Sequence, residues 1–132
     1  MERLESTTVS ISIKAKPEKI YKFVSDVRNG PKWGKTYCWS VKKAGGKWIM
    51  ETPQGPVGIR IAKKNSLGVL DHYIKPAGCG EVLVPVRVVL NGTGSEVIFT
   101  VFRQTGMSAK SYAGDIELVK KDLRTLKKVM ER

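Results

Sequence analysis

The sequence contains one histidine, His72, and this residue has the clearest capacity for chemistry. A neutral imidazole on the apolar face of a sheet can donate a hydrogen bond to a ligand or act as a general base. The sequence equally allows a buried histidine whose ring is satisfied by a backbone carbonyl, a helix side chain or water. Asp71 is adjacent, but successive residues of a strand point to opposite faces, so we expect no Asp71–His72 dyad.

Large aromatic and sulfur-containing side chains form a second candidate group. Flat side chains of this size can line a pocket for a ring or an acyl chain, and they can equally fill that volume themselves. We expect them where the short helices, the early strands and the start of the last helix meet. The members of this group are Trp33, Tyr37, Trp48, Met50, Met107 and Tyr112.

The sequence lacks the patterns of metal and nucleophile sites. Cys38 and Cys79 match no metal-ligand spacing, and a lone histidine does not form a multi-histidine site. The segment Gly45-Gly46-Lys47 lacks the remainder of a phosphate-binding loop. We therefore expect no metal and no cofactor.

Basic residues dominate the charge, because 24 Lys and Arg against 12 Asp and Glu give a formal net charge of +12. Such a charge permits attraction to nucleic acid, an anionic membrane or anionic ligands. The basic residues are scattered in runs no longer than pairs, and no nucleic-acid-binding motif accompanies them. We favour a solvated basic surface, since nucleic-acid binding would require these side chains to gather on one face.

The length of 132 residues indicates one domain, residues 1–132, with a core of its own. No apolar run approaches the roughly twenty residues of a membrane span. The first residues also lack the apolar segment of a signal peptide. We therefore expect a cytoplasmic protein with no membrane span.

Periodicity predicts the elements that must position these side chains. Val9, Ile11 and Ile13 alternate with polar residues and indicate a strand, and Pro17 begins a short helix. A second helical turn is expected at 30–35. Turns rich in Gly, Pro and Asn then separate six expected strands, at 38–43, 47–52, 57–64, 69–76, 81–90 and 95–104.

A long helix is expected to close the chain, from about Ser108 to Arg132. The Ser108 hydroxyl can accept a hydrogen bond from a first-turn N–H and so cap the start. Apolar residues at alternating steps of four and three form one stripe: Tyr112, Ile116, Val119, Leu123, Leu126 and Met130. A stripe of this length needs an equally long apolar partner, which the strands can supply.

Short turns make neighbouring strands antiparallel and suggest their register. The expected opposite pairs are Ile61–His72, Ile59–Ile74, His72–Val84 and Val84–Val101. One face then collects the residues that can receive the helix: Trp48, Met50, Val57, Ile59, Ile61, Leu70, Ile74, Val82, Val84, Val86, Val88, Val97, Phe99 and Val101.

The opposite face is expected to carry ion pairs, with Asp71 within reach of Arg60 and Arg87. Apolar residues also fall on this outer face, where a large exposed patch usually marks a partner. The residues that could form such a homodimer surface are Val89, Ile98 and Phe102.

The sequence also resembles a known superfamily along nearly its whole length. The resembling segments are Ile13 to Asp26 followed by Trp33, Gly68-Val-Leu-Asp71-His72, Val84-Pro-Val-Arg87, Phe99 to Met107, and Asp115 to Leu126. Together with the order of elements, they resemble the helix-grip fold of the START/Bet v 1-like (SRPBCC) superfamily, especially its polyketide cyclase/dehydrase-like branch. The resemblance implies an α+β fold in which a curved, antiparallel seven-stranded sheet wraps around the C-terminal helix, with two short helices after the first strand.

In that superfamily a cavity between sheet and helix often holds an apolar small molecule, but the fold serves many functions. We favour binding of an apolar or aromatic, lipid- or polyketide-like molecule. The alternatives are a cyclase/dehydratase-type enzyme with His72 as acid or base, and a basic interaction module for nucleic acid or a protein partner. The expected ligand-binding residues are Trp33, Trp48, Met50, Ile61, His72, Val84, Phe99, Tyr112, Val119 and Leu123.

Overall fold

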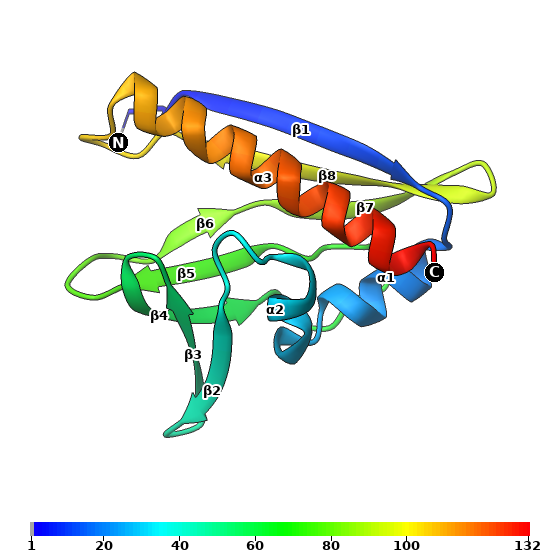
Figure 1. Ribbon diagram of the computed structural model, residues 1–132, viewed down its shortest axis with the longest axis horizontal. Coiled ribbons are helices and arrows are strands. Elements are labelled where there is room, and N and C mark those ends of the chain that lie inside the picture. Colours follow the sequence, from blue (N-terminus) through cyan, green and yellow to red (C-terminus); the bar gives the residue numbers. More distant parts are fainter. Residues whose placement is uncertain (1) are drawn as a thin grey trace.

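The computed structural model describes residues 2–132 and contains two antiparallel sheets, two short helices and one long helix (Figure 1). The three-stranded sheet has the order β1 (Ser6–Ile13), β8 (Gly94–Phe102) and β7 (Val86–Asn91). The five-stranded sheet follows the chain order β2 (Ser40–Ala44), β3 (Lys47–Thr52), β4 (Gly55–Ile61), β5 (His72–Pro76) and β6 (Val82–Val84). The helices are α1 (Pro17–Val24), α2 (Gly30–Trp33) and α3 (Ala109–Met130), with a 3₁₀ turn at Val27–Asn29. This arrangement confirms the expected α+β class, with short helices after the first strand and a long helix at the end.

The expected strand 81–90 is divided at Pro85 into β6 and β7. Proline has no N–H for a ladder bond, so regular pairing is interrupted there. On the β8 side, the pairing ends with a bond from the Thr100 N–H to the Pro85 carbonyl (3.0 Å). The single seven-stranded sheet expected from the sequence is therefore two sheets that separate at this point, with eight strands in residues 2–132.

Most of the expected register is confirmed. The confirmed opposite pairs are Ile61–His72, Ile59–Ile74 and His72–Val84. Val84 and Val101 do not form the expected fourth pair in the described strands, because β6 and β8 belong to different sheets beyond Pro85.

The chain before β5 changes sheets at the same place. The Leu70 N–H donates to the Val86 carbonyl (2.8 Å), and the Val88 N–H donates to the Gly68 carbonyl (3.0 Å), so this stretch lies along β7. His72 then begins β5 in the other sheet. Two antiparallel segments, 68–72 and 84–88, thus pass together from one sheet to the other, and we call this place the corner. His72 is the first residue of β5 there.

Asp71 ties this corner through its side chain. Its carboxylate accepts hydrogen bonds from the Val86 N–H (3.0 Å) and from Nε and Nη2 of Arg87 (3.1 and 2.9 Å). The expected ion pair with Arg87 is confirmed, whereas Arg60 instead pairs with Glu81. The position of Asp71 is explained by this structural role.

The buried apolar side chains form two separate clusters. The larger one joins α1, α2 and the C-terminal half of α3 to the three-stranded sheet, and includes Ile20, Val97 and Leu126. The smaller one lies on the five-stranded sheet and consists of Cys38, Met50, Val57 and Ile74. Val84 packs against both clusters and so lies between them.

The long helix begins as predicted, because the Ser108 hydroxyl accepts a hydrogen bond from the Ser111 N–H (3.0 Å). Its apolar stripe is covered unevenly: Tyr112, Leu123, Leu126 and Met130 are buried, whereas Ile116 and Val119 are half-buried. The helix packs on β1 and α2, and Figure 1 shows it running along β1 above the five-stranded sheet. The N-terminal half of the stripe is therefore left partly open.

The residues that could form a homodimer surface differ in exposure, since Val89 is exposed and Ile98 and Phe102 are half-buried. Within residues 2–132, no helix has the length and apolar character needed to cross a membrane.

Candidate functional site

The candidate site is the inner face of the five-stranded sheet. Its buried members are Met50, Val57 and Ile74, and its half-buried members are Trp48, Ile59, Ile61, His72, Val82 and Val84. An apolar sheet face is normally buried by a second layer. Here α3 packs on β1 and α2 and leaves this face partly uncovered. This half-buried apolar face, together with the N-terminal half of α3 opposite it, is referred to below as the cleft.

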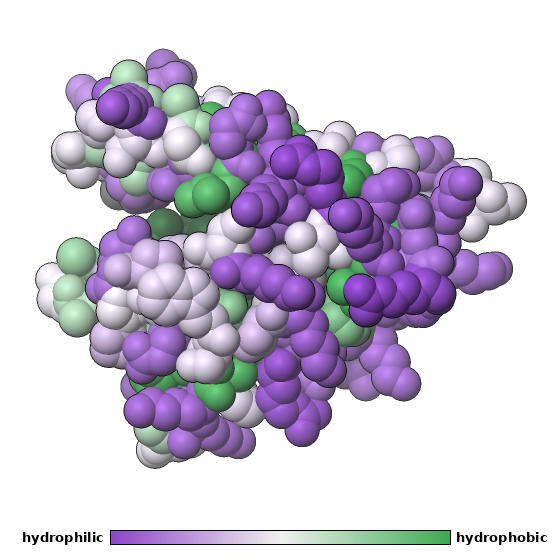
Figure 2. Space-filling view, viewed as in Figure 1, coloured by the Kyte–Doolittle hydropathy of each residue, from purple (hydrophilic) through white to green (hydrophobic). Residues whose placement is uncertain are grey.

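A pocket of about 330 Å³ lies where β6 and the end of β8 diverge. It is lined by Glu2, Leu4, Glu81, Val82, Leu83, Phe102 and Gln104. Figure 2 shows the molecule hollowed between α3 and β6, with hydrophobic surface at the edges of the hollow. Val82 and Val84 are alternate residues of β6 and share the inner face that His72 occupies, whereas Leu83 points to the outer face. The pocket therefore lies at the edge of β6 and touches the inner face only at Val82.

His72 is the polar side chain between Ile61 and Val84 on this inner face. Its Nδ1–H donates a hydrogen bond to the Leu70 carbonyl (2.7 Å), since a carbonyl oxygen can only accept. This bond fixes the tautomer and leaves Nε2 as an acceptor. Nε2 has no hydrogen-bond partner in the described chain. All fully buried side-chain nitrogens of that chain do have a partner, so Nε2 is not fully buried and is accessible to solvent or a ligand. The ring of Trp33 meets the imidazole edge to face, with the centroids 6.4 Å apart.

The environment of His72 favours the neutral ring. Burial lowers its pKa, although the bond to Leu70 and the charge of Asp71 act in the opposite direction. A neutral imidazole can accept either a hydrogen bond or a proton at Nε2. The hydrogen bond from the His72 ring to a backbone carbonyl, which the sequence analysis allowed, is present, but it uses only one of the two ring nitrogens.

A second polar group, which the sequence analysis did not single out, joins α3 to the segment between α2 and β2. Asp122 is buried, and its carboxylate accepts hydrogen bonds from the Thr36 N–H (3.1 Å) and the Thr36 hydroxyl (2.6 Å). The signal in the sequence is its place at the edge of the stripe, three residues after Val119 and four before Leu126. These bonds hold the segment 34–39 against the helix.

The next two residues of this segment, Tyr37 and Cys38, both have raised pKa values. Burial raises the pKa of Tyr37, and the charge of Asp115 on α3 adds to the effect. Burial raises the pKa of Cys38 to about 11, with a smaller contribution from the charge of Asp122. The Cys38 thiol is therefore protonated at neutral pH and is a poor nucleophile. In residues 2–132, no group of three or more His, Cys, Asp or Glu side chains is arranged to hold a metal ion.

Replacing Asp122 with asparagine should flatten the pH dependence of stability above about pH 4. Burial raises the pKa of Asp122 above its ordinary value of 3.8, despite the opposing hydrogen bonds from Thr36. The native state therefore holds this proton more tightly than the unfolded chain, and the free energy of unfolding decreases as pH rises through the native pKa. Asparagine keeps an acceptor for the Thr36 N–H and carries no charge. Urea unfolding of both proteins at stepped pH tests this, and an identical pH slope in the two would contradict it.

The expected ligand-binding residues have different surroundings. Trp33, Leu123 and Met50 are buried in the core clusters, and Trp48, Ile61, His72, Val84, Phe99 and Val119 are half-buried. The structure brings Trp33, Ile61 and Val84 around His72.

Three of the expected residues have other packing partners. Met50 belongs to the smaller cluster and Leu123 to the larger. Tyr112 is tied to the three-stranded sheet, because its hydroxyl lies 2.7 Å from the Thr7 hydroxyl and donates to the Val101 carbonyl (3.1 Å).

No protein-family model matches the sequence, and no protein of curated function is significantly similar to it. Solved structures do resemble it. The chain aligns with XoxI from Bacillus cereus at a TM-score of 0.75 and 18% identity, over 96% of both chains. It aligns with the Aha1 dimer from Colwellia psychrerythraea at a TM-score of 0.74 and 16% identity, over 97% of both chains.

The crystal structure of Ara h 8.0201, a Bet v 1 homologue, aligns at a TM-score of 0.68 and 13% identity, over 97% of this chain and 98% of that one. Identities at this level establish a shared fold. Together with the long helix, the two short helices and the antiparallel sheets, these similarities show that the chain has the helix-grip fold of the Bet v 1-like (SRPBCC) proteins.

Proposed function

We propose that this chain binds a small, mostly apolar molecule of a lipid- or polyketide-like kind in the cleft. The observation that carries the proposal is that Ile59, Val82 and Val84 point inward and yet remain half-buried. Removing apolar surface from water is favourable by about 25 cal/mol per Å². An apolar ligand in the cleft would therefore bury its own surface together with the side chains that α3 and the sheet leave half-exposed.

His72 gives the cleft a polar contact among apolar neighbours. Its Nε2 can accept a hydrogen bond from a ligand hydroxyl, while Ile61 and Val84 on the adjacent strands supply apolar walls. A few polar groups set in a mostly apolar wall are typical of small-molecule sites, where they fix the orientation of the ligand. We therefore expect the preferred ligand to carry a hydroxyl group on a ring or chain.

Filling the cleft tests the proposal. Wild-type protein should bind the neutral, apolar dye Nile red with a blue-shifted emission. Val84→Trp places an indole between the two core clusters, where Val84 now packs against both. Its affinity for the dye should be at least about tenfold lower, a loss of ~1.4 kcal/mol. Fluorescence titration measures the affinity, and circular dichroism checks that the variant is folded.

Two further variants make the result specific. Val82→Trp places the same bulk on the inner face of β6, two residues away, and should also weaken binding if Val84→Trp does not fold. Val89→Trp makes the same chemical change at an exposed position of β7 and should bind as the wild type does. Absence of dye binding by the wild type, or equal affinity in all three variants, would reject the cleft as the binding site.

A further inference from the structure

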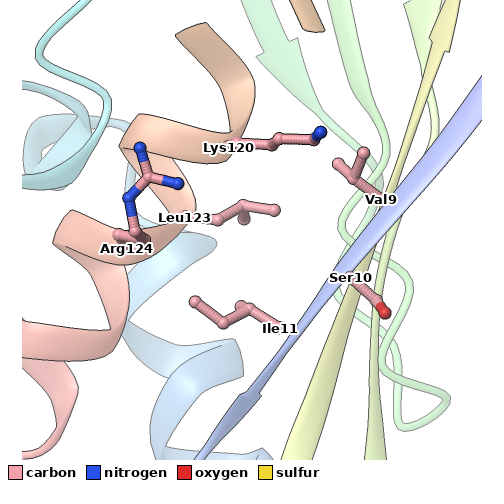
Figure 3. A pocket seen from close by; sticks show the side chains of 6 residues that line it. All are labelled: Val9, Ser10, Ile11, Lys120, Leu123 and Arg124. Atoms are coloured by element: carbon pink, nitrogen blue, oxygen red, sulfur yellow. The ribbon is translucent and has the colours of Figure 1, made fainter. Parts of the chain in front are cut away.

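The helix α3 is tied to β1 at two places, with a gap between them. At one end, the Tyr112 hydroxyl lies 2.7 Å from the Thr7 hydroxyl. At the other, Nζ of Lys127 donates to the Ser12 carbonyl (2.8 Å). These ties are about 22 Å apart along the helix. Between them is a groove of about 340 Å³, lined by Val9, Ser10, Ile11, Lys120, Leu123 and Arg124 (Figure 3). We call it the β1–α3 groove.

The floor of the β1–α3 groove is apolar. Figure 3 shows Val9 and Ile11 pointing from β1 toward the helix, and Leu123 pointing from α3 toward them. Val9 and Ile11 are half-buried, although they lie on the same face of the sheet as the buried Ile13. The groove therefore leaves part of this face without a protein neighbour, as the cleft does on the other flank of α3.

The backbone of β1 adds unpaired polar groups to the groove. The Ser12 carbonyl bonds to Lys127 of α3 and the Lys14 N–H bonds to Glu131 directly after it, so these alternate residues direct their backbone groups away from β8. Ser10 is two residues before Ser12 in the same alternation, so its backbone N–H and carbonyl also face the free edge of the strand. The side chain of Ser10 points away from α3 in Figure 3. Ser10 thus contributes a backbone donor and acceptor rather than its hydroxyl.

Two cations border the groove. Lys120 extends its amine over Val9 (Figure 3), and Arg124 lies about one turn further along α3. The nearest carboxylate to Lys120 is that of Glu117, with N and O 3.8 Å apart and both side chains largely exposed. Arg124 makes no ion pair in the described chain. The groove therefore combines an apolar floor with positive charge that lacks a strong internal partner.

We propose that the β1–α3 groove binds a single-chain anionic amphiphile, such as a medium-chain carboxylate. Its hydrocarbon chain would cover Val9, Ile11 and Leu123, and its carboxylate would meet Lys120 and Arg124. A purely apolar ligand would make no ion pair with Lys120 and Arg124, and an inorganic anion would leave the apolar floor of the groove exposed to water. The site is separate from the cleft, which lies on the opposite flank of α3, and the proposal does not depend on binding there.

The test compares decanoate with decanol, which has the same chain and no charge. Backbone amide shifts followed by NMR should show decanoate perturbing Ser10 and its neighbours on β1. The double variant Lys120→Glu/Arg124→Glu should weaken decanoate binding by at least about tenfold, while any binding of decanol stays unchanged. Lys121→Glu/Lys128→Glu is the matched control, because it makes the same change in charge at exposed positions of the same helix that do not line the groove.

The outcomes separate this site from the cleft. If both double variants weaken decanoate binding equally, the effect is a general one of net charge and the β1–α3 groove is rejected. If decanoate binding is lost in Val84→Trp but unaffected by Lys120→Glu/Arg124→Glu, the amphiphile occupies the cleft, and only the proposed function stands. Absence of decanoate binding by the wild type also rejects the groove.

Discussion

Replacing Gly68 with alanine is expected to lower the free energy of unfolding by about 3 kcal/mol, from a left-handed backbone and a steric clash together. Gly68 has φ +74°, and a Cβ there would overlap the Val88 carbonyl oxygen. The Gly68 carbonyl also accepts the Val88 N–H bond that holds the corner, so the clash falls on a hydrogen-bonded pair. Urea unfolding followed by circular dichroism measures the effect.

Gly92 provides the matched control for this prediction. It also has a positive φ, +58°, but an added Cβ there meets no atom within 4 Å. Gly92→Ala should therefore show only the backbone cost, about 1–2 kcal/mol. Equal destabilisation by the two substitutions would show that the close approach at Gly68 is relieved by a small shift, and that the corner is more compliant than its geometry indicates.

Replacing Asp71 with alanine should destabilise the protein by about 3 kcal/mol, because it strands the Val86 N–H and removes both bonds from Arg87. The Asp71 side chain is 10% exposed, so water replaces these bonds poorly. The exposed pair of Arg60 and Glu81 is the control, and Glu81→Ala should change stability little. Denaturant titration of the two variants beside the wild type gives the comparison.

The same substitution should change the response to acid. Burial alone would raise the pKa of Asp71, but the hydrogen bonds from Arg87 and the Val86 N–H outweigh it, and the pKa lies below its ordinary 3.8. A lowered native pKa means that the stabilisation is present above the unfolded pKa and is lost as pH falls below about 4. The acid loss of stability should be smaller in Asp71→Ala. An unchanged acid midpoint would show that Asp71 does not control it.

Much of the fold could be predicted from local rules, because those rules concern neighbours in the chain. Turn lengths predicted the pairs that His72 makes with Ile61 and Val84, and both are confirmed. The position of Ser108 just before the apolar stripe was enough to predict the helix cap. The location of His72 on the inner face followed from the same alternation.

The division of the sheet could not be predicted in the same way. Pro85 signals a missing N–H, but whether the strands on either side bend together or part depends on how α3 and the N-terminal strand pack. The role of Asp122 was hidden for a related reason. Its partner Thr36 is 86 residues away in the sequence, and no periodicity connects the two.

The corner formed by 68–72 and 84–88 also separates two packing units of unequal size. Each sheet has its own core cluster, and the cluster on the five-stranded sheet is the smaller. We therefore expect that sheet to loosen as one cooperative unit while the three-stranded sheet and the end of α3 stay folded. A molecule held in the cleft would contact both units, and its binding energy would act mainly on the weaker one.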